Sequence, residues 1–133
     1  MDNKSDIEPL VTCILDACYE VHRHLKAGYA ESVYHKALKH ELGLRGLDTT
    51  YKDALQVSYK GINVGNYEPD LIVEDEVIIE LKSVPHISDV HCIQLVNYLT
   101  ITGIDHGLVV NFGADKFEAR RRYRKYTPKN TVH

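Results

Sequence analysis

Long apolar runs are absent from the sequence, and none approaches the ~20 residues that a helix needs to cross a bilayer. The first residues, Met1 to Glu8, are polar and do not resemble a signal peptide. Repeats, low-complexity tracts and linkers are also absent, so we expect one domain over residues 1–133. With 44% hydrophobic residues the chain can bury a core. These features predict a soluble, cytoplasmic protein with no membrane partner.

Cysteine is scarce as well. The three cysteines form no CxxC pair, and their odd number argues against a disulfide framework. The simplest interpretation is that they are small, buried apolar residues. A Cys/His zinc site is a weak alternative, because the spacings match no structural zinc pattern. Its ligands would come from Cys18, His22, His24, His91 and Cys92.

The formal charge of −3 is unevenly distributed along the chain. Residues 116–133 contain seven Lys or Arg and one acid, a charge of +6, and the remainder contains nine basic and eighteen acidic residues, a charge of −9. A basic C-terminal tail on an acidic body is typical of an arm that binds a polyanion. A solvated helix or strand end would carry the same charges, and the charge pattern alone leaves both interpretations open.

Hydrophobic spacing predicts an α/β protein in the order α-α-β-β-β-β-α-β, followed by the basic tail. Apolar residues three and four apart indicate the helices, and alternation or short apolar runs indicate the strands. A single mixed sheet flanked by helices is the natural packing of these elements. The predicted helices cover residues 7–25, 30–44 and 88–102, and the predicted strands cover 55–59, 62–67, 71–73, 77–79 and, last, 107–112.

Charged residues stand at the matched ends of the two short apolar strands in the stretch EPDLIVEDEVIIELK. A three-residue loop at 74–76 would pair residue 73 with 77 and place Asp70 opposite Glu80, about 4.5–5.5 Å apart on one face. Lys82 lies two residues beyond Glu80 and shares that face. The loop contains no glycine, and a loop of even length would put the two acids on opposite faces.

Adjacent carboxylates repel each other, so their pairing favours a cation between them. Mg²⁺ binds through one or two carboxylates, and such an ion stabilises charge on a phosphate under attack. Asp70, Glu80 and Lys82 on one rim therefore predict a site for phosphodiester hydrolysis. The spacing D-x₉-E-x-K by itself also fits a surface ion pair.

Two flanking patterns add to this group. In GYAESVY, Glu31 and Tyr34 lie three apart on one helix face, with the glutamate in the first turn, where it also suits the helix dipole. In the third predicted helix His91, Gln94 and Tyr98 share a face beside the core stripe. Glutamine and tyrosine can hold phosphate oxygens, although a solvated helix flank has the same composition.

Five ordered blocks resemble the GxxExxY protein family, which is part of the PD-(D/E)XK nuclease superfamily. The blocks read EVHRHL, GYAESVY, PDLIVEDEVIIELK, HCIQLVNYL and VVNFG, and the resemblance spans roughly residues 6 to 125. Lys26-Ala27 replaces the Gly-Pro that usually precedes the motif glycine in the family, and Glu68 stands where a basic residue is common. Neither change removes a signature residue.

The resemblance implies a restriction-endonuclease-like core whose metal ligands are Asp70 and Glu80, with Glu31 as the acid from the preceding helix. Lys82 matches the catalytic lysine, and Gln94 with Tyr98 matches the Q-x-x-x-Y of the exonuclease branch. The implied metal is Mg²⁺ or Mn²⁺. The expected catalytic residues are thus Glu31, Asp70, Glu80, Lys82 and Gln94. The expected substrate-binding residues are Tyr34, His91, Tyr98, Arg120, Arg121 and Arg122.

The leading prediction is a metal-dependent nuclease that acts on nucleic acid, with DNA favoured over RNA. The alternative is a catalytically silent nucleic-acid-binding or assembly module with the same fold, since a fold does not fix an activity. The acidic body supports the alternative, and the complete carboxylate–lysine set supports the nuclease. Small nucleases of this kind often act as dimers, so a homodimer is a further expectation.

Overall fold

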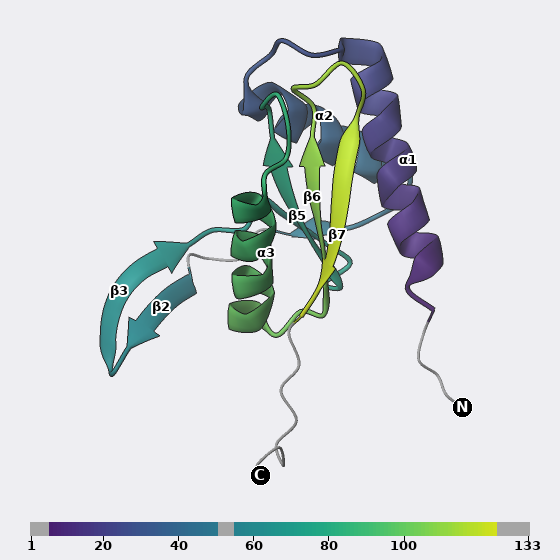
Figure 1. The fold of residues 1–133 in the computed structure, drawn as a ribbon. Helices are drawn as coiled ribbons and strands as arrows, with labels where there is room; N and C mark the ends of the chain where they lie inside the picture. Colours follow the sequence, from purple (N-terminus) through teal and green to yellow (C-terminus); the bar gives the residue numbers. More distant parts are fainter. Residues whose placement is uncertain (1–5, 51–54, 125–133) are drawn as a thin grey trace.

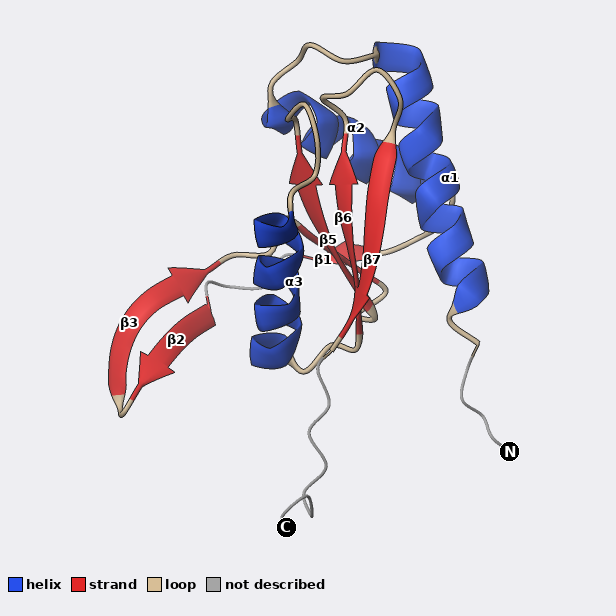
Figure 2. Ribbon diagram, in the orientation of Figure 1, coloured by secondary structure: helices blue, strands red, loops and turns tan. Residues whose placement is uncertain are grey.

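The computed structural model describes residues 6–50 and 55–124. A central five-stranded sheet, ordered β1-β4-β5-β6-β7, lies between helices on its two faces (Figures 1 and 2). The fold is therefore mixed α/β, as the sequence predicts. In chain order the elements are α1 (Glu8–Leu25), α2 (Glu31–Leu44), β1 (Thr49–Thr50), β2 (Leu55–Tyr59), β3 (Ile62–Tyr67), β4 (Leu71–Val73), β5 (Val77–Lys82), α3 (Asp89–Thr102), β6 (His106–Asn111) and β7 (Glu118–Tyr123).

The antiparallel pair β4–β5 has the predicted register, with Val73 opposite Val77 across a three-residue loop. The loop forms without glycine because Glu74 and Asp75 both adopt positive φ, 54° and 56°. Residue Glu74 is also fixed from outside the loop. Its backbone N–H donates to the Asp48 carbonyl at 2.9 Å, and its carboxylate accepts the Asp48 N–H at 2.7 Å. These two bonds tie the loop to the segment before β1.

Alternation along the strands divides the core into two clusters, one on each face of the sheet. Val77, Ile79 and Leu81 pack with α1 and α2, whereas Ile78 packs with Cys92, Leu95 and Leu99 of α3. Since successive side chains of a strand point to opposite faces, Glu80 and Lys82 lie on the α3 face with Ile78. The layers thus assign a face to each charged residue at the strand ends.

β7 lies within the predicted basic tail and was absent from the predicted order of elements, although the charge pattern left a strand end open. Residues 118–123 form an edge strand that pairs antiparallel with β6, and β6 in turn runs parallel to β5 through the α3 crossover. The alternation of this strand is hidden in the sequence by three consecutive arginines. Residues 125–133, the rest of the predicted tail, lie outside the described residues.

The β2–β3 hairpin also differs from the single predicted sheet. Both strands and their Lys60-Gly61 turn form where predicted, but they make a separate two-stranded sheet. Figure 1 shows this hairpin projecting away from the body on the side of α3. Its last residue, Tyr67, is buried, whereas Tyr59, Ile62 and Val64 are exposed. Helices long and apolar enough to cross a membrane do not occur in residues 6–50 and 55–124.

The loop after β5 is held against the end of β6. Asn111 donates to the Val84 carbonyl at 2.8 Å and accepts the Val84 N–H at 3.0 Å. Gly113 passes so close to this loop that a Cβ on it would lie 2.3 Å from the Val84 nitrogen and 2.5 Å from the Ser83 carbonyl carbon. Only glycine fits at this position without moving the backbone that follows Lys82.

We expect Gly113→Ala to destabilise the protein by about 1–3 kcal/mol or more, because its methyl group meets backbone atoms that cannot rotate away. Gly43→Ala is the matched control. It lies in α2 with nothing within 4 Å of the new methyl group, so it should stabilise the helix by up to about 1 kcal/mol. Urea unfolding of both variants measures the difference, and equal stability of the two would contradict the close approach at Gly113.

Candidate active site

Asp70 and Glu80 lie side by side at the edge of the β4–β5 pair. Leu71 is opposite Ile79 in the register, so the next residues outward, Asp70 and Glu80, are neighbours on the α3 face. Glu80 is 9% exposed, and Asp70 is half-buried. Two acids that are separated by nine residues in the sequence are therefore neighbours in a site that is largely shielded from water.

Each carboxylate accepts a hydrogen bond from the protein. The Leu81 backbone N–H donates to Oδ2 of Asp70 at 2.8 Å, and the Tyr67 hydroxyl donates to Oε2 of Glu80 at 2.6 Å. Tyr67 was not among the predicted site residues. In the sequence it is only the last residue of an alternating strand, and no local pattern links it to Glu80.

Burial and the neighbouring negative charge of Asp70 raise the pKa of Glu80 to about 7. The Tyr67 hydroxyl, the Asp70 backbone amide and the positive charge of Lys82 act in the opposite direction. Burial and the charge on Glu80 also raise the pKa of Tyr67, so the phenol keeps its proton and remains a donor. Glu80 is therefore partly protonated near neutral pH.

Lys82 completes the predicted signature on the same side of the sheet. It is the last residue of β5, two residues beyond Glu80, and it is half-buried. Its charge lowers the pKa of Glu80, which places the ammonium group within electrostatic reach of the carboxylates. The end of the β4–β5 pair therefore carries two carboxylates and the Lys82 ammonium group close together.

α3 brings Tyr98 over this group. The Tyr98 ring stacks on Tyr67 with centroids 3.5 Å apart and planes 13° from parallel. Burial and then the charges of Glu80 and Asp70 raise the Tyr98 pKa, so its hydroxyl lies near both acids. Gln94 is exposed one helical turn before Tyr98, on the same side of α3 and nearer the end of β5 that carries Lys82.

α2 approaches the site from the other face of the sheet. His35 Nε2 donates to the Asp70 carbonyl at 2.8 Å, and the Ser83 hydroxyl donates to the Tyr29 carbonyl at 3.0 Å. Glu31 begins α2 and lies one turn before His35 on the same helix face. These contacts put Glu31 beside the end of β5, although it is exposed and forms no three-acid group with Asp70 and Glu80. His35 is a second contact that no sequence pattern indicated.

Tyr34 is a correction to the predicted substrate contacts. Its side chain is fully buried and stacks on Phe112 with centroids 4.8 Å apart. Its hydroxyl donates to the Lys26 carbonyl and accepts the Tyr29 N–H at 3.2 Å. Gly28 lies between these anchors at φ +122°, a conformation that L side chains rarely adopt. Tyr34 therefore holds the loop that precedes Glu31, and its side chain is not exposed to contact a substrate.

His91 lies at the start of α3. Ser88 caps α3, and its backbone N–H donates to His91 Nδ1 at 3.1 Å in a capping box. The ring is half-buried at the start of the helix. Its Nδ1 thus satisfies a backbone amide at the helix end, and its contact with phosphate stays a prediction.

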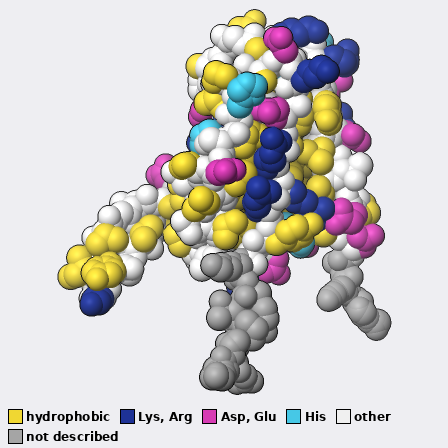
Figure 3. Space-filling view, viewed as in Figure 1, with side chains coloured by type: hydrophobic (Ala, Val, Ile, Leu, Met, Phe, Trp, Pro, Cys, Tyr) yellow, Lys and Arg dark blue, Asp and Glu magenta, His cyan; other side chains and the backbone are white. Residues whose placement is uncertain are grey.

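The three arginines of β7 point to different faces of the sheet. Arg120 and Arg122 pair with Val109 and Gly107, and Val109 belongs to the α3 cluster. Arg121 faces α1, where it donates to both carboxylate oxygens of Glu8 at 2.8 and 2.9 Å. Lys and Arg side chains gather over β7 in the face shown in Figure 3. Only Arg120 and Arg122 therefore remain on the side of the acids, and Arg121 is a correction.

The zinc alternative is contradicted by the layers of the fold. Cys18 and His22 pack in the cluster under α1, and Cys92 packs under α3 across the sheet. His22 Nε2 also bonds to the Ala114 carbonyl at 2.9 Å. Burial raises the pKa of the Cys18 thiol, which keeps it neutral. In residues 6–50 and 55–124 no three His, Cys, Asp or Glu side chains are grouped to hold a metal.

The Asp70–Glu80 pair still fits a hard divalent cation. Mg²⁺ and Mn²⁺ prefer oxygen ligands, and Mg²⁺ usually keeps several waters while binding through one or two carboxylates. A cation between the acids would also remove the repulsion that raises the Glu80 pKa. The donor chemistry therefore suits such an ion even though the described residues supply only two adjacent acids.

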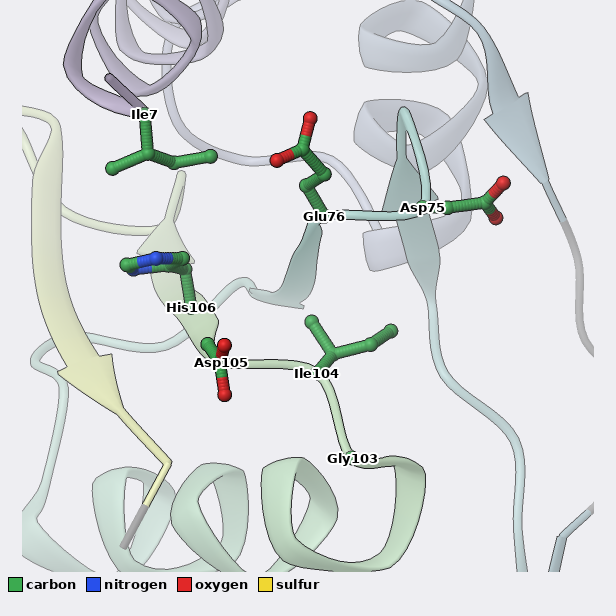
Figure 4. Close-up of a pocket in the computed structure, with 7 residues that line it drawn as sticks. All are labelled: Ile7, Asp75, Glu76, Gly103, Ile104, Asp105 and His106. Atoms are coloured by element: carbon green, nitrogen blue, oxygen red, sulfur yellow. The ribbon is translucent and has the colours of Figure 1, made fainter. Parts of the chain in front are cut away.

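A separate cavity of about 400 Å³ lies at the opposite end of the strands (Figure 4). Asp75 and Glu76 come from the loop before β5, and Asp105 and His106 from the start of β6. In Figure 4 the Asp75 carboxylate points away from Glu76 and His106, so the acids do not converge. None of the predicted site residues lines this cavity.

The structure is an α/β core with paired acids and a lysine on one strand rim. A sequence profile of the PD-(D/E)XK nuclease superfamily matches residues 8–123. The match covers most of the chain, and this protein belongs to that superfamily. Its nucleases act on nucleic acid and typically use divalent metals. Restriction-endonuclease-like is therefore the appropriate description of the core.

The crystal structure of SSO0001 is similar in fold, with a TM-score of 0.51 and 18% sequence identity. The similarity covers 72% of this chain and 50% of that chain. This chain thus spans about half the length of the solved protein it resembles. A search of curated proteins gave no significant match.

The raised Glu80 pKa predicts how stability without metal depends on pH. Because the folded state holds the proton up to about pH 7 and the unfolded state only to about 4.5, this group's stabilising contribution is lost as pH rises through that window. Between pH 5 and 8 the free energy of unfolding of the wild type should fall by roughly 2–3 kcal/mol relative to that of Glu80→Gln, at about 1.4 kcal/mol per pKa unit. Urea unfolding in chelator measures it, with Glu76→Gln, an exposed loop glutamate, as control. Parallel pH profiles for wild type and Glu80→Gln would contradict the shift.

Proposed function

We propose that this protein is a metal-dependent nuclease of the GxxExxY type that hydrolyses phosphodiester bonds. The carrying observation is the pair of the half-buried Asp70 and the buried Glu80, each acid held by hydrogen bonds, with Lys82 on the same rim. Burying two like charges together costs free energy that an ordinary surface ion pair would not require. An arrangement of this kind is expected where a cation is to be held.

The residues of the rim take distinct roles in this proposal. Asp70 and Glu80 hold Mg²⁺ or Mn²⁺, and Glu31 reaches the same edge from the start of α2. The ion, when bound, supplies positive charge beside the phosphate under attack. The Lys82 ammonium donates to a phosphate oxygen and neutralises charge as it develops. Gln94 and Tyr98 orient the phosphate from α3.

The substrate in this proposal is nucleic acid, with DNA favoured over RNA. Arg120 and Arg122 lie on the α3 face of the sheet and supply the cationic surface that a phosphate backbone needs. A homodimer and a cytoplasmic location stay predictions from the sequence.

The second candidate is a silent nucleic-acid-binding or assembly module. One observation favours it: in the part of the chain that the structure describes, no third acid joins Asp70 and Glu80. A module without turnover has no need of a cation at this pair. Metal binding therefore separates the two candidates before any substrate is known.

We expect wild type to bind Mn²⁺ by calorimetry, and Glu80→Ala to bind it at least about tenfold more weakly because one of two carboxylates is lost. Glu76→Ala is the matched control, since it removes an exposed glutamate at the opposite end of β5. Circular dichroism establishes that each variant is folded. Wild type that fails to bind Mn²⁺, alone or with an oligonucleotide, would leave the module as the better account.

Lys82→Ala should retain Mn²⁺ binding and lose cleavage by roughly 10²–10³-fold, the usual cost of one preorganised donor. The assay uses labelled single- and double-stranded DNA and RNA with Mg²⁺ or Mn²⁺. Cleavage by Lys82→Ala at the wild-type rate would remove this residue from the site.

Salt dependence tests the surface of β7. Replacing Arg120 and Arg122 together by alanine should lower the slope of log K against log salt for a DNA duplex by up to roughly 1.8, at about 0.9 per phosphate contact. Arg121→Ala should leave the slope unchanged because its guanidinium is paired with Glu8 on the other face. Fluorescence anisotropy at several salt concentrations measures both. The same slope in the double variant and wild type would exclude β7 from the interface.

A further inference from the structure

The hydroxyl of Tyr67 has a partner that no local sequence pattern explains. It donates to Oε2 of Glu80 at 2.6 Å, in a bond that is buried. Tyr67 is 6% exposed and Glu80 is 9% exposed, so water cannot readily replace either partner. A short hydrogen bond between a phenol and an ionised carboxylate is among the stronger ones in proteins.

The ring of Tyr67 is fixed from two sides. Tyr98 of α3 stacks on it with planes 13° from parallel, and its backbone pairs with Leu55 at the base of the β2–β3 hairpin. The buried Pro69 follows two residues later and leads directly into Asp70. One short, restrained segment therefore carries both the Tyr67 hydroxyl and the second carboxylate of the pair.

The two anchors are complementary. Leu81 N–H binds Oδ2 of Asp70 and the Tyr67 hydroxyl binds Oε2 of Glu80. A hydrogen bond to one oxygen restrains the rotamer of a carboxylate and so reduces the search for the orientation that binds a cation. The Glu80 carboxylate also accepts a hydrogen bond from the Asp70 backbone amide, so it is restrained by more than one contact where it meets Asp70.

We propose that Tyr67 is a positioning residue that holds Glu80 in the orientation in which the Asp70–Glu80 pair binds a divalent cation. The inference rests on the proposed function. It adds that the hairpin is joined to the metal site through its last residue, and that the stack on Tyr98 couples α3 to the same carboxylate. Tyr67 touches neither substrate nor metal and acts only through Glu80.

Tyr67→Phe tests the role because it keeps the ring and its stack and removes only the hydroxyl. We expect its Kd for Mn²⁺, measured by calorimetry well below the unfolding temperature, to rise about tenfold, as is usual when a partner of a metal ligand is lost. Tyr59→Phe, an exposed tyrosine of the same hairpin, should bind Mn²⁺ like wild type. A merely structural tyrosine would lower the melting temperature and leave the Mn²⁺ Kd unchanged.

A double-mutant cycle shows whether the effect passes through Glu80. Tyr67→Phe should raise the unfolding equilibrium constant about five- to tenfold in the wild-type background and leave it nearly unchanged in Glu80→Ala, where the hydroxyl has lost its partner. Equal effects in both backgrounds would overturn the inference. If wild type and Tyr67→Phe bind Mn²⁺ equally well, the inference about Tyr67 is wrong but the proposed function stands. If wild type does not bind Mn²⁺, both the proposed function and the inference are wrong.

Discussion

The register between β4 and β5 is the constraint on which the rest of the site depends. Side chains alternate along a strand, so a slip of one residue would send Asp70 and Glu80 to opposite faces of the sheet. The three-residue loop fixes that register, and it is secured by two residues at positive φ and by the paired bonds between Glu74 and Asp48. An exposed loop far from the acids thus decides whether they meet.

The acids are then stabilised by contacts from every layer. Leu81 and Tyr67 each hold one carboxylate oxygen, and His35 of α2 holds the carbonyl of Asp70 from the other side of the sheet. These bonds offset part of the cost of burying like charges, but the Glu80 pKa remains near 7. Glu80 is thus costly to bury in its charged form, yet hydrogen bonds hold the pair in place. Such a conflict between a local cost and the overall fold is expected at a functional site.

Much of the architecture followed from periodicity. The helices, the β2–β3 hairpin and the β4–β5 pair form where apolar spacing placed them, because burial of one face dictates those patterns. The sequence did not predict β7 because Arg120, Arg121 and Arg122 conceal its alternation, and its pairing with β6 reveals it. Tyr34 was assigned to the surface because its helix spacing is the same whether its hydroxyl meets a substrate or the loop at Lys26.

The sequence by itself determined which residues of one element share a face: Glu80 with Lys82 on one strand, and Gln94 with Tyr98 along one side of a helix. Local geometry suffices for this, since it depends only on periods of 2.0 and 3.6 residues. Tertiary structure alone decided which partners meet across elements, such as Tyr67 with Glu80 and His35 with the Asp70 carbonyl, 13 and 35 residues apart. The reason is that the residue period of a strand or helix specifies only the direction in which a side chain leaves the backbone. A contact between two elements also depends on how they pack, which the period does not specify.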